Sequence, residues 1–296
     1  TASADAVLIR VSNLSPKIDE QFAERDVVVG TFAAPDKLPY ARRGTISFSV
    51  ELAGSGAAGT EPEWGDLLQG CGMTPTITAS TRVDYTPVST GLKTMTIWAY
   101  INNRLEKFNF AAGTVKLSAE VGKMPTLDFT FKALVTSVAA ASAPSATLSA
   151  WKRAEAVAPG VSALILGAVT YSAGAVSGGT SYNFKTFGAD LANDVQDLAL
   201  ASSESIGIYG RAPTCNMVAD FGGTAHAAFK ADMHAGTNRA VAFTHGSAAG
   251  KKIIVYAPVG VITDVADSQQ GSVMLDSMSM TLRPSSGNDD LRIVVF

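Results

Sequence analysis

The sequence predicts a mainly β protein, built of two tandem antiparallel β-sandwich or barrel-like domains that each carry one short flanking α-helix. Apolar and polar residues alternate with a period of two through most of the chain, which is typical of antiparallel sheets with one face on a core. Two short stretches instead favour helices. The order strand, glycine-rich turn, short helix, hairpin and further strands occurs twice, which indicates a weak internal duplication.

The first half contains five alternating segments. In the first of them, Ile46, Phe48 and Val50 share one face while Thr45, Ser47 and Ser49 share the other. Asn102-Asn103 is a turn signal that joins two of the segments into a hairpin. The predicted strands cover residues 45–52, 94–101, 104–110, 115–120 and 126–132.

The second half repeats this pattern. We expect strands at residues 206–209, 215–221, 239–245, 251–255 and 273–282, and a helix at 225–234. Residues 45–52 correspond to 215–221, and residues 113–134 correspond to 260–283. Few identities support the correspondence, so two unrelated β domains are the alternative.

An Ala/Ser-rich stretch with Pro144 separates the halves and is typical of a linker. We therefore divide the chain into a first β domain at residues 1–140, a linker at 141–160 and a second β domain at 161–296. The charged segment Pro16–Gly30 and the Gly/Ser-rich segment Tyr171–Tyr182 are predicted as long loops. One role for such a loop is an arm that becomes ordered on a neighbouring subunit.

Composition restricts the partners. Charged residues make up 17% of the 296 residues, fewer than in an average globular protein, which suggests that much surface is buried against other copies. The formal net charge of -3 argues against a protein that grips nucleic-acid phosphates. The chain contains no apolar run long enough to span a membrane and no apolar leader after a basic start, so we expect neither membrane insertion nor a signal peptide.

Gly54, Gly56 and Gly59 form the pattern G-x-G-x-x-G, which raises the alternative of a nucleotide-binding enzyme. The preceding strand alternates, whereas a dinucleotide site follows a buried parallel strand. Glu61 and Glu63 follow the glycines and would repel a diphosphate at the positive end of the helix. The glycines therefore favour a tight turn that leads into a helix.

The predicted helix has its own signals. Thr60 is its expected N-cap, with Pro62 in the first turn and Gly72 as the C-terminal stop. One apolar stripe at helical spacing faces the sheet, and it consists of Trp64, Leu67, Leu68 and Cys71.

No residue pattern points to a catalytic, cofactor-binding or metal site. His226, His234 and His245 have spacings that match no metal motif, and a site with Asp220 or Asp232 would require the fold to bring them together. We expect the histidines at the surface or in hydrogen bonds. Cys71 and Cys215 are predicted to be buried free thiols. Solvated strand faces explain the remaining carboxylates, namely Glu120, Asp128, Asp264, Asp267 and Asp276.

Several segments in order resemble the major tail tube proteins of long-tailed, siphovirus-type bacteriophages. In the first half they are residues 48–56, 59–72, 85–89, 113–115 and 125–131, and in the second half they are residues 183–187, 190–195 and 204–206. The resemblance implies a β-sandwich or barrel-like unit with one flanking helix, repeated in rings that stack into a hollow tube. Usual members place one domain in each chain and six chains in each ring. With two domains in one chain, the resemblance implies three chains in a pseudo-sixfold ring.

The resemblance also implies a structural protein of the virion that needs no catalytic residue, cofactor or metal. It implies assembly in the host bacterial cytoplasm, with other copies of the chain, the tape measure protein and the tail terminator or distal tail proteins as partners. Double-stranded DNA would pass through the lumen to the host without specific binding. The alternative is another virion or surface β-protein, such as a decoration or adhesion module.

Overall fold

The computed structural model describes residues 6–25, 36–145 and 151–296, and these residues form sixteen strands and two helices. The prediction of a mainly β, antiparallel protein is confirmed. The strands are β1 (Ser12–Glu24), β2 (Lys37–Glu51), β3 (Met73–Thr78), β4 (Arg82–Pro87), β5 (Met95–Ile101), β6 (Arg104–Glu120), β7 (Thr126–Ala140), β8 (Ser162–Ser172), β9 (Ala175–Asp190), β10 (Asn193–Leu200), β11 (Ser203–Arg211), β12 (Thr214–Asp220), β13 (Asn238–His245), β14 (Ile253–Gln270), β15 (Val273–Arg283) and β16 (Arg292–Val295). The helices are α1 (Gly65–Gly70) and α2 (Gly222–Ala235).

The strands of the second half pair in a closed circuit. β8 pairs with β9, and the pairing continues through β12, β15, β14 and β13 back to β8. Closure gives each strand of this circuit two neighbours, although β13 pairs with β14 only as far as Val261. The first half is open, because its strands pair in the order β1, β2, β7, β6, β5 and stop there.

The two halves share one pairing order. β2, β7, β6 and β5 are neighbours in the first half, as β12, β15, β14 and β13 are in the second. In each half a helix follows the first strand of this set. The sequence correspondence of 45–52 with 215–221 and of 113–134 with 260–283 therefore matches strands that have the same neighbours.

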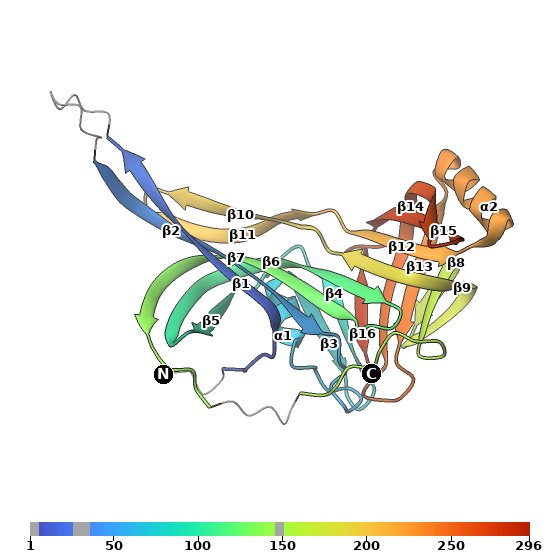
Figure 1. Cartoon of the computed structure of the whole chain (residues 1–296), viewed down its shortest axis with the longest axis horizontal. Helices are drawn as coiled ribbons and strands as arrows, with labels where there is room; N and C mark the ends of the chain where they lie inside the picture. Colours follow the sequence, from blue (N-terminus) through green and yellow to red (C-terminus); the bar gives the residue numbers. More distant parts are fainter. Residues whose placement is uncertain (1–5, 26–35, 146–150) are drawn as a thin grey trace.

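Two junctions connect the halves (Figure 1). Residues 116–120 of β6 pair with residues 186–190 of β9, so one sheet continues from the first half into the second. At the other junction, the C-terminal strand β16 lies between β14 and β4. Predicted strands 104–110 and 115–120 form the single strand β6, which is bent by a bulge between Asn109 and Ala112.

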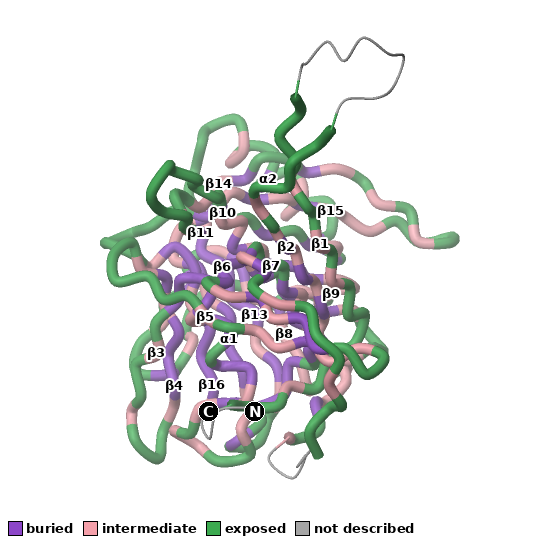
Figure 2. Tube along the Cα trace, turned by 90° about the vertical axis from the view of Figure 1, so that its left-hand side faces the viewer, coloured by how far each residue is buried: buried purple, intermediate pink, exposed green. Residues whose placement is uncertain are grey.

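One apolar cluster extends through both halves. Its first part contains the mutually packed rings of Phe48, Phe129 and Phe131. Its second part contains Phe243, stacked on Phe187 with ring centroids 4.8 Å apart. Burial is concentrated in this body, while the projecting hairpins are exposed (Figure 2). The alternating residues predicted to face a core do so in β2, β7 and β12.

The helices differ from the predictions at their starts. α1 begins at Gly65 with Trp64 as its N-cap, so the prediction of Thr60 as cap and Pro62 in the first turn was wrong. Because Glu61 and Glu63 lie before the helix, Asp66 is the acidic residue of its first turn. The apolar stripe is confirmed, since Trp64, Leu67, Leu68 and Cys71 are all buried. α2 is longer than predicted and ends at Gly236 in the left-handed conformation.

Both predicted long loops are hairpins instead. Pro16–Glu24 belongs to β1, which pairs with β2, while residues 26–30 of that segment lie outside the described residues. Its charged side chains form ion pairs across the two strands, Lys37 with Glu24 and Arg42 with Glu20, both at 2.6 Å. Because both faces of β1 carry charged residues, its sequence lacks the apolar–polar alternation that predicts a strand. Tyr171–Tyr182 forms the β8–β9 hairpin, with a turn at Ala173-Gly174.

The connection between the halves lies between the end of β7 and the start of β8. β7 continues to Ala140, and residues 141–145 and 151–161 have no strand or helix. Residues 146–150 of the predicted linker lie outside the described residues.

A buried carboxylate joins the halves at the second junction. Asp84 of β4 is 4% exposed. Its Oδ1 accepts hydrogen bonds from the Tyr171 hydroxyl of β8 (2.5 Å) and from Arg292 of β16 (3.3 Å), and its Oδ2 accepts one from Arg82 (2.7 Å). Burial and the bond to Asp84 raise the pKa of Tyr171 to about 12. The charge of Asp84 is thus balanced by two arginines that come from different halves.

We expect Asp84→Ala to lower the free energy of unfolding by about 3–5 kcal/mol, because it leaves Arg82 and Arg292 without their shared buried partner. Denaturant unfolding under conditions that keep the chain monomeric measures the change. The matched control is Asp264→Ala, which removes an exposed aspartate of β14 and should change the value by less than about 0.5 kcal/mol. Equal effects of the two variants would contradict this account of the junction.

Candidate functional site

The glycine-rich loop makes a contact between the two halves. The Gly56 amide donates to the carbonyl oxygen of Gly250 at 2.8 Å, and Gly250 lies in the turn that joins β13 to β14. A Cβ on Gly54 or on Gly250 would overlap the backbone of the facing loop. The G-x-G-x-x-G pattern is therefore explained by two backbones that approach each other closely, which requires residues without side chains.

The side chains around this loop support the same conclusion. The Trp64 indole donates to the carbonyl oxygen of Ala53 at 2.8 Å and so fixes the loop to α1. A small pocket beside it is lined by Glu61 and Glu63, with Lys152 on the opposite side. Glu61 accepts a hydrogen bond from the Tyr85 hydroxyl at 3.2 Å. A diphosphate placed here would meet two carboxylates.

A polar, concave face extends across the first junction. An open groove of about 550 Å³ runs over β6, β9, β12 and β15, and its side chains are mainly small and polar, including Ser118, Thr186, Asn216, Ser277 and Ser279. These residues alternate with the buried core residues of the same strands, so they form the opposite face of the sheet.

Charges on this concave face are nearly balanced. Glu120 forms an ion pair with Lys123 at 2.7 Å, and that lysine lowers the pKa of Glu120. Lys116 lies between two carboxylates, since it is the register partner of Asp128 on one side and of Asp190 on the other. The face therefore presents no basic patch of the kind that holds nucleic-acid phosphates.

Several strands have an edge without a partner in the part of the chain that the structure describes, namely β3, β5, β10 and β11, and two further edges, on β1 and β14, are the ones that the pairing of β6 with β9 makes relevant. β1 pairs with β2 along one edge, and no described strand pairs with the other. β14 pairs with β15 up to Gln270, but on its opposite edge its pairing with β13 stops at Val261, so residues 262–270 have one unpaired edge. Free edges of this length are sites where another chain can add to the sheet.

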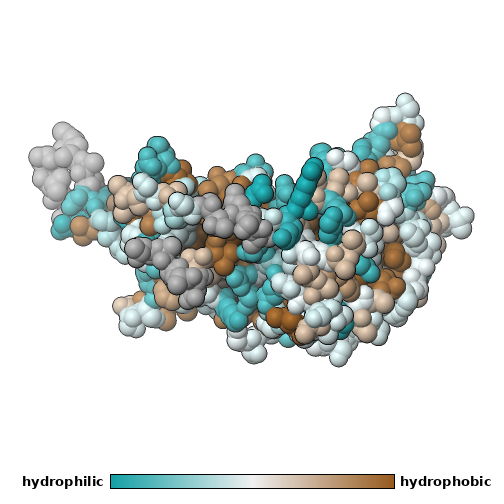
Figure 3. Space-filling model, turned by 90° about the horizontal axis from the view of Figure 1, so that it is seen from below, coloured by the Kyte–Doolittle hydropathy of each residue, from teal (hydrophilic) through white to brown (hydrophobic). Residues whose placement is uncertain are grey.

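Two hairpins project from the body, β1–β2 and β10–β11 (Figure 1). Arg43 of β2 holds them together through Asp197 (2.9 Å) and Glu204 (3.1 Å) of the second hairpin, and it lowers the pKa of Asp197. Both hairpins expose large apolar side chains, which are Phe22, Leu38, Tyr40, Leu198, Leu200 and Tyr209. Seen from below, by contrast, the molecule has hydrophobic and hydrophilic side chains interspersed (Figure 3).

The structure places the histidines and cysteines as expected in most respects. Cys71 and Cys215 are buried free thiols, and burial raises the pKa of Cys215 to about 12. His234 is exposed, and His226 bonds to Asp276 at 2.6 Å. Asp232, which the sequence places near these histidines, instead forms an ion pair with Arg239 at 2.6 Å.

The carboxylates expected on solvated faces include one exception. Asp264 and Asp267 are exposed, and Asp128 accepts a hydrogen bond from Ser118 at 3.2 Å. The prediction was wrong for Asp276, whose side chain is 14% exposed and is enclosed by His226 and the start of α2. Residue 276 lies on the same face of β15 as the buried Met278 and Met280, so the alternation of the strand itself indicates that its side chain points inward.

His245 is the most deeply buried histidine among the described residues, at 1% exposed. Its Nδ1 bonds to the Ser162 hydroxyl at 2.8 Å, and its Nε2 has no hydrogen-bond partner among the described residues. Burial lowers the pKa of His245, so the neutral imidazole is the form that the folded protein accommodates.

Comparison with known proteins gives one match. Residues 1–290 match a family model described as "Phage tail tube protein". No curated protein matches the chain. Neither helix of the described residues is long and apolar enough to cross a membrane.

We expect Gly54→Ala to loosen the contact between the glycine-rich loop and Gly250, because its methyl group would overlap the Gly250 carbonyl. Protease cleavage near residues 54–59 or 246–250 should become faster, and the melting temperature should fall by several degrees. Gly210→Ala is the matched control, since a Cβ there meets nothing within 4 Å. Unchanged cleavage and stability in Gly54→Ala would show that the close approach is not required.

We expect His245 to make stability depend on pH. Its folded pKa lies below the unfolded value of about 6.5, so protonation favours the unfolded chain. The stabilisation is complete above that value, and it declines as the pH falls through 6.5 towards the folded pKa. As the pH falls through this range, the unfolding free energy of the native protein should decrease faster than that of His245→Asn. The difference between the two slopes should be up to about 1.4 kcal/mol per pH unit. Parallel curves for the two proteins would contradict the assignment.

Proposed function

The chain belongs to the phage tail tube protein family, and we propose that it polymerises into stacked rings, which form the hollow tube of a siphovirus-type tail. Membership of this family points to a structural protein of the virion tail rather than an enzyme. We further propose that the chain is a duplicated tube domain, divided at residues 1–140 and 161–296, and that three chains form each ring with pseudo-sixfold symmetry.

The observation that carries the proposal is the pairing of β6 with β9 inside one chain. β2 and β12 are the corresponding strands of the two halves, and they pair with the corresponding strands β7 and β15. Residues 15–19 of β1 pair with 47–43 of β2, as residues 186–190 of β9 pair with 218–214 of β12. β1 therefore occupies in the first half the place that β9 occupies in the second.

The partner of each strand follows from the same correspondence. Within the chain, β9 pairs with residues 116–120 of β6, on the side of β6 beyond the end of β5. The corresponding side of β14, at residues 262–270 beyond the end of β13, has no partner among the described residues, and neither does the outer edge of β1. We propose that β14 of one chain pairs with β1 of the next.

Repetition of this junction closes a ring. A head-to-tail contact produces a closed ring when its rotation divides a full turn. If the rotation between the two halves of one chain equals the rotation between the adjoining halves of neighbouring chains, each chain occupies two of six positions, and three chains complete the circle. The edges of β1 and β14 would then both be paired, which removes the aggregation risk of these two long exposed edges.

The concave polar face suits the lumen of such a tube. It lies on the sheet that would continue around the ring, and its balanced charges would give a passing DNA duplex no phosphate contacts that hold it. The apolar side chains on the β1–β2 and β10–β11 hairpins suit contacts with the next ring, since both hairpins extend away from the body. Rings joined in this way would form a tube.

The partners and location follow from the family. The principal partner is the chain itself, and we propose the tape measure protein and the tail terminator or distal tail proteins as further partners. Double-stranded DNA would pass through the lumen towards the host without specific binding. Assembly would take place in the cytoplasm of the host bacterium, and the mature protein would reside in the phage tail.

Electron microscopy of the purified protein tests the proposal. We expect rings of three chains with six similar lobes, or tubes built of such rings, under conditions that permit assembly.

Asp267→Pro should prevent ring closure without unfolding the chain. The Ala266 carbonyl accepts a hydrogen bond from Ser277 of β15, so the amide of the next residue points towards the free edge, where proline removes a donor.

Asp267→Asn is the matched control for this experiment, because it changes the same side chain but keeps the amide. It should assemble as the native protein does. Rings of Asp267→Pro as abundant as those of the native protein would contradict the proposed strand pairing. Uniform monomers of the native protein under all assembly conditions would contradict the proposed function itself, and six chains in each ring would contradict the duplicated domain.

A further inference from the structure

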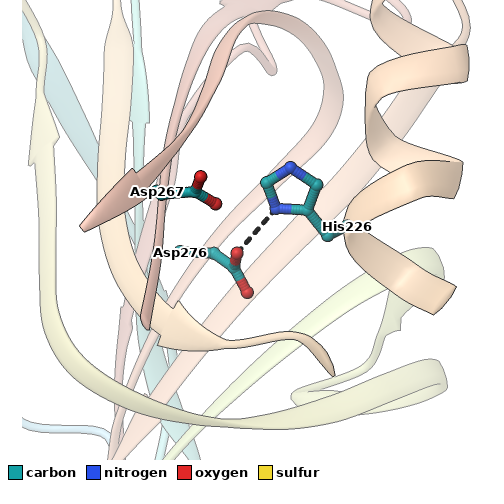
Figure 4. A group of neighbouring side chains, drawn as sticks. All are labelled: His226, Asp267 and Asp276. Carbon is teal, nitrogen blue, oxygen red and sulfur yellow. Dashed lines mark hydrogen bonds and ion pairs between the residues drawn. The ribbon is translucent and has the colours of Figure 1, made fainter. Parts of the chain in front are cut away.

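His226, Asp267 and Asp276 come together at the base of α2 (Figure 4). One nitrogen or oxygen atom of each side chain lies within 4.8 Å of those of the other two. His226 lies in the early part of α2, and its Nδ1 is 2.6 Å from Asp276 Oδ1. The two aspartates come from the adjacent strands β14 and β15.

The two aspartates are direct register partners across these strands. Carboxylates that face each other across an antiparallel pair repel and destabilise the sheet. No lysine or arginine within the described residues forms an ion pair with either of them. The side chain of Asp276 is only 14% exposed, whereas Asp267 is exposed, so water screens the repulsion from the Asp267 side alone. A positive charge close to both carboxylates would relieve it.

We propose that His226, Asp267 and Asp276 bind a divalent transition metal ion of the zinc class. One imidazole nitrogen and two carboxylate oxygens are ligands that zinc accepts, and imidazole disfavours the harder ions magnesium and calcium. The site has three protein ligands, so water would supply the fourth. The histidine binds as the neutral imidazole, and the two carboxylates neutralise the charge of the ion.

The surroundings of Asp276 support ligand binding. Its second oxygen, Oδ2, accepts a hydrogen bond from the amide of Phe221 at 3.1 Å. Ligating carboxylates are commonly held in this way by a neighbouring hydrogen bond, which orients the free lone pair. Asp276 is thus fixed from one side by the backbone at the start of α2, while its Oδ1 faces His226 and Asp267.

A metal ion here would connect α2 to the β14–β15 hairpin. α2 has one fully buried side chain, Phe229, so few apolar contacts hold the helix on the barrel. The ligands come from the helix and from both strands of the hairpin, and β14 is the strand with the free edge at residues 262–270. The ion would therefore stabilise a part of the barrel that packing alone holds weakly.

Zinc titration of the full chain tests the proposal, after dialysis against a chelator and then into chelator-free buffer. Isothermal titration with zinc chloride should show saturable binding of one ion per chain. The melting temperature should rise by about 5 °C when free zinc exceeds the dissociation constant a hundredfold. Magnesium chloride at the same concentration should produce neither effect. X-ray absorption of the zinc-loaded protein should show nitrogen and oxygen ligands without sulfur.

Three variants separate this site from other sources of binding. His226→Ala and Asp267→Asn should each weaken zinc binding at least tenfold, and the exposed Asp267 can be changed with little risk to the fold. His234→Ala is the matched control, because it removes an exposed histidine of the same helix and should bind as the native protein does. Absence of saturable binding, or equal binding by Asp267→Asn and the native protein, would overturn the proposal.

Discussion

The need to pair backbone groups at strand edges is the constraint on which the rest of this structure depends. In the second half it is met by closure, since β8 returns the sheet to β13. In the first half the sheet stays open, and β9 of the second half completes the edge of β6. The glycine-rich loop, the Asp84 junction and β16 then hold the halves in the orientation that this shared sheet requires. The edges of β1 and β14 remain free, and they determine how one chain can meet another.

Charged residues are few, and several of them connect separate parts of the structure. Asp84 is buried where two arginines from different halves reach it, and Arg43 joins two projecting hairpins through Asp197 and Glu204. The concave face balances Lys116 and Glu120 against neighbours of opposite sign. The least exposed of these ion pairs, those of Asp84, thus lie at the junction of the two halves.

Much of the fold could be predicted from alternation, and the failures have physical causes. β12 and the start of β7 were predicted closely, because one face is apolar and the other polar, whereas β7 continues to Ala140, beyond the predicted end at residue 132. β1 was missed, because its two faces are both exposed and its charges pair across strands rather than alternate. The β8–β9 turn was missed, because glycines at 178 and 179 lie within a strand instead of ending one. The start of α1 was misplaced, because Thr60 and Pro62 are residues that favour helix starts but lie here in local turns, in which the Thr60 amide donates to Ala57 and the Pro62 carbonyl accepts from Gly65.

The candidate sites were predictable to a lesser degree. Glu61 and Glu63 made it possible to disfavour a nucleotide site at the glycine-rich loop. The partner of that loop, Gly250, could not be predicted, because it is distant in sequence and no local pattern identifies it. His226, Asp267 and Asp276 meet only through the register of β14 with β15.

Amide hydrogen exchange, read residue by residue in the unassembled and assembled protein, tests the central claim most directly. The account predicts that alternate amides of residues 262–270 in β14, and those on the outer edge of β1, exchange quickly in the monomer and become protected on assembly. The amides of residues 116–120 in β6 should be protected in both states, because their partner β9 lies in the same chain. Assembly that leaves the exchange of β1 and β14 unchanged would contradict the claim that these edges join the chains.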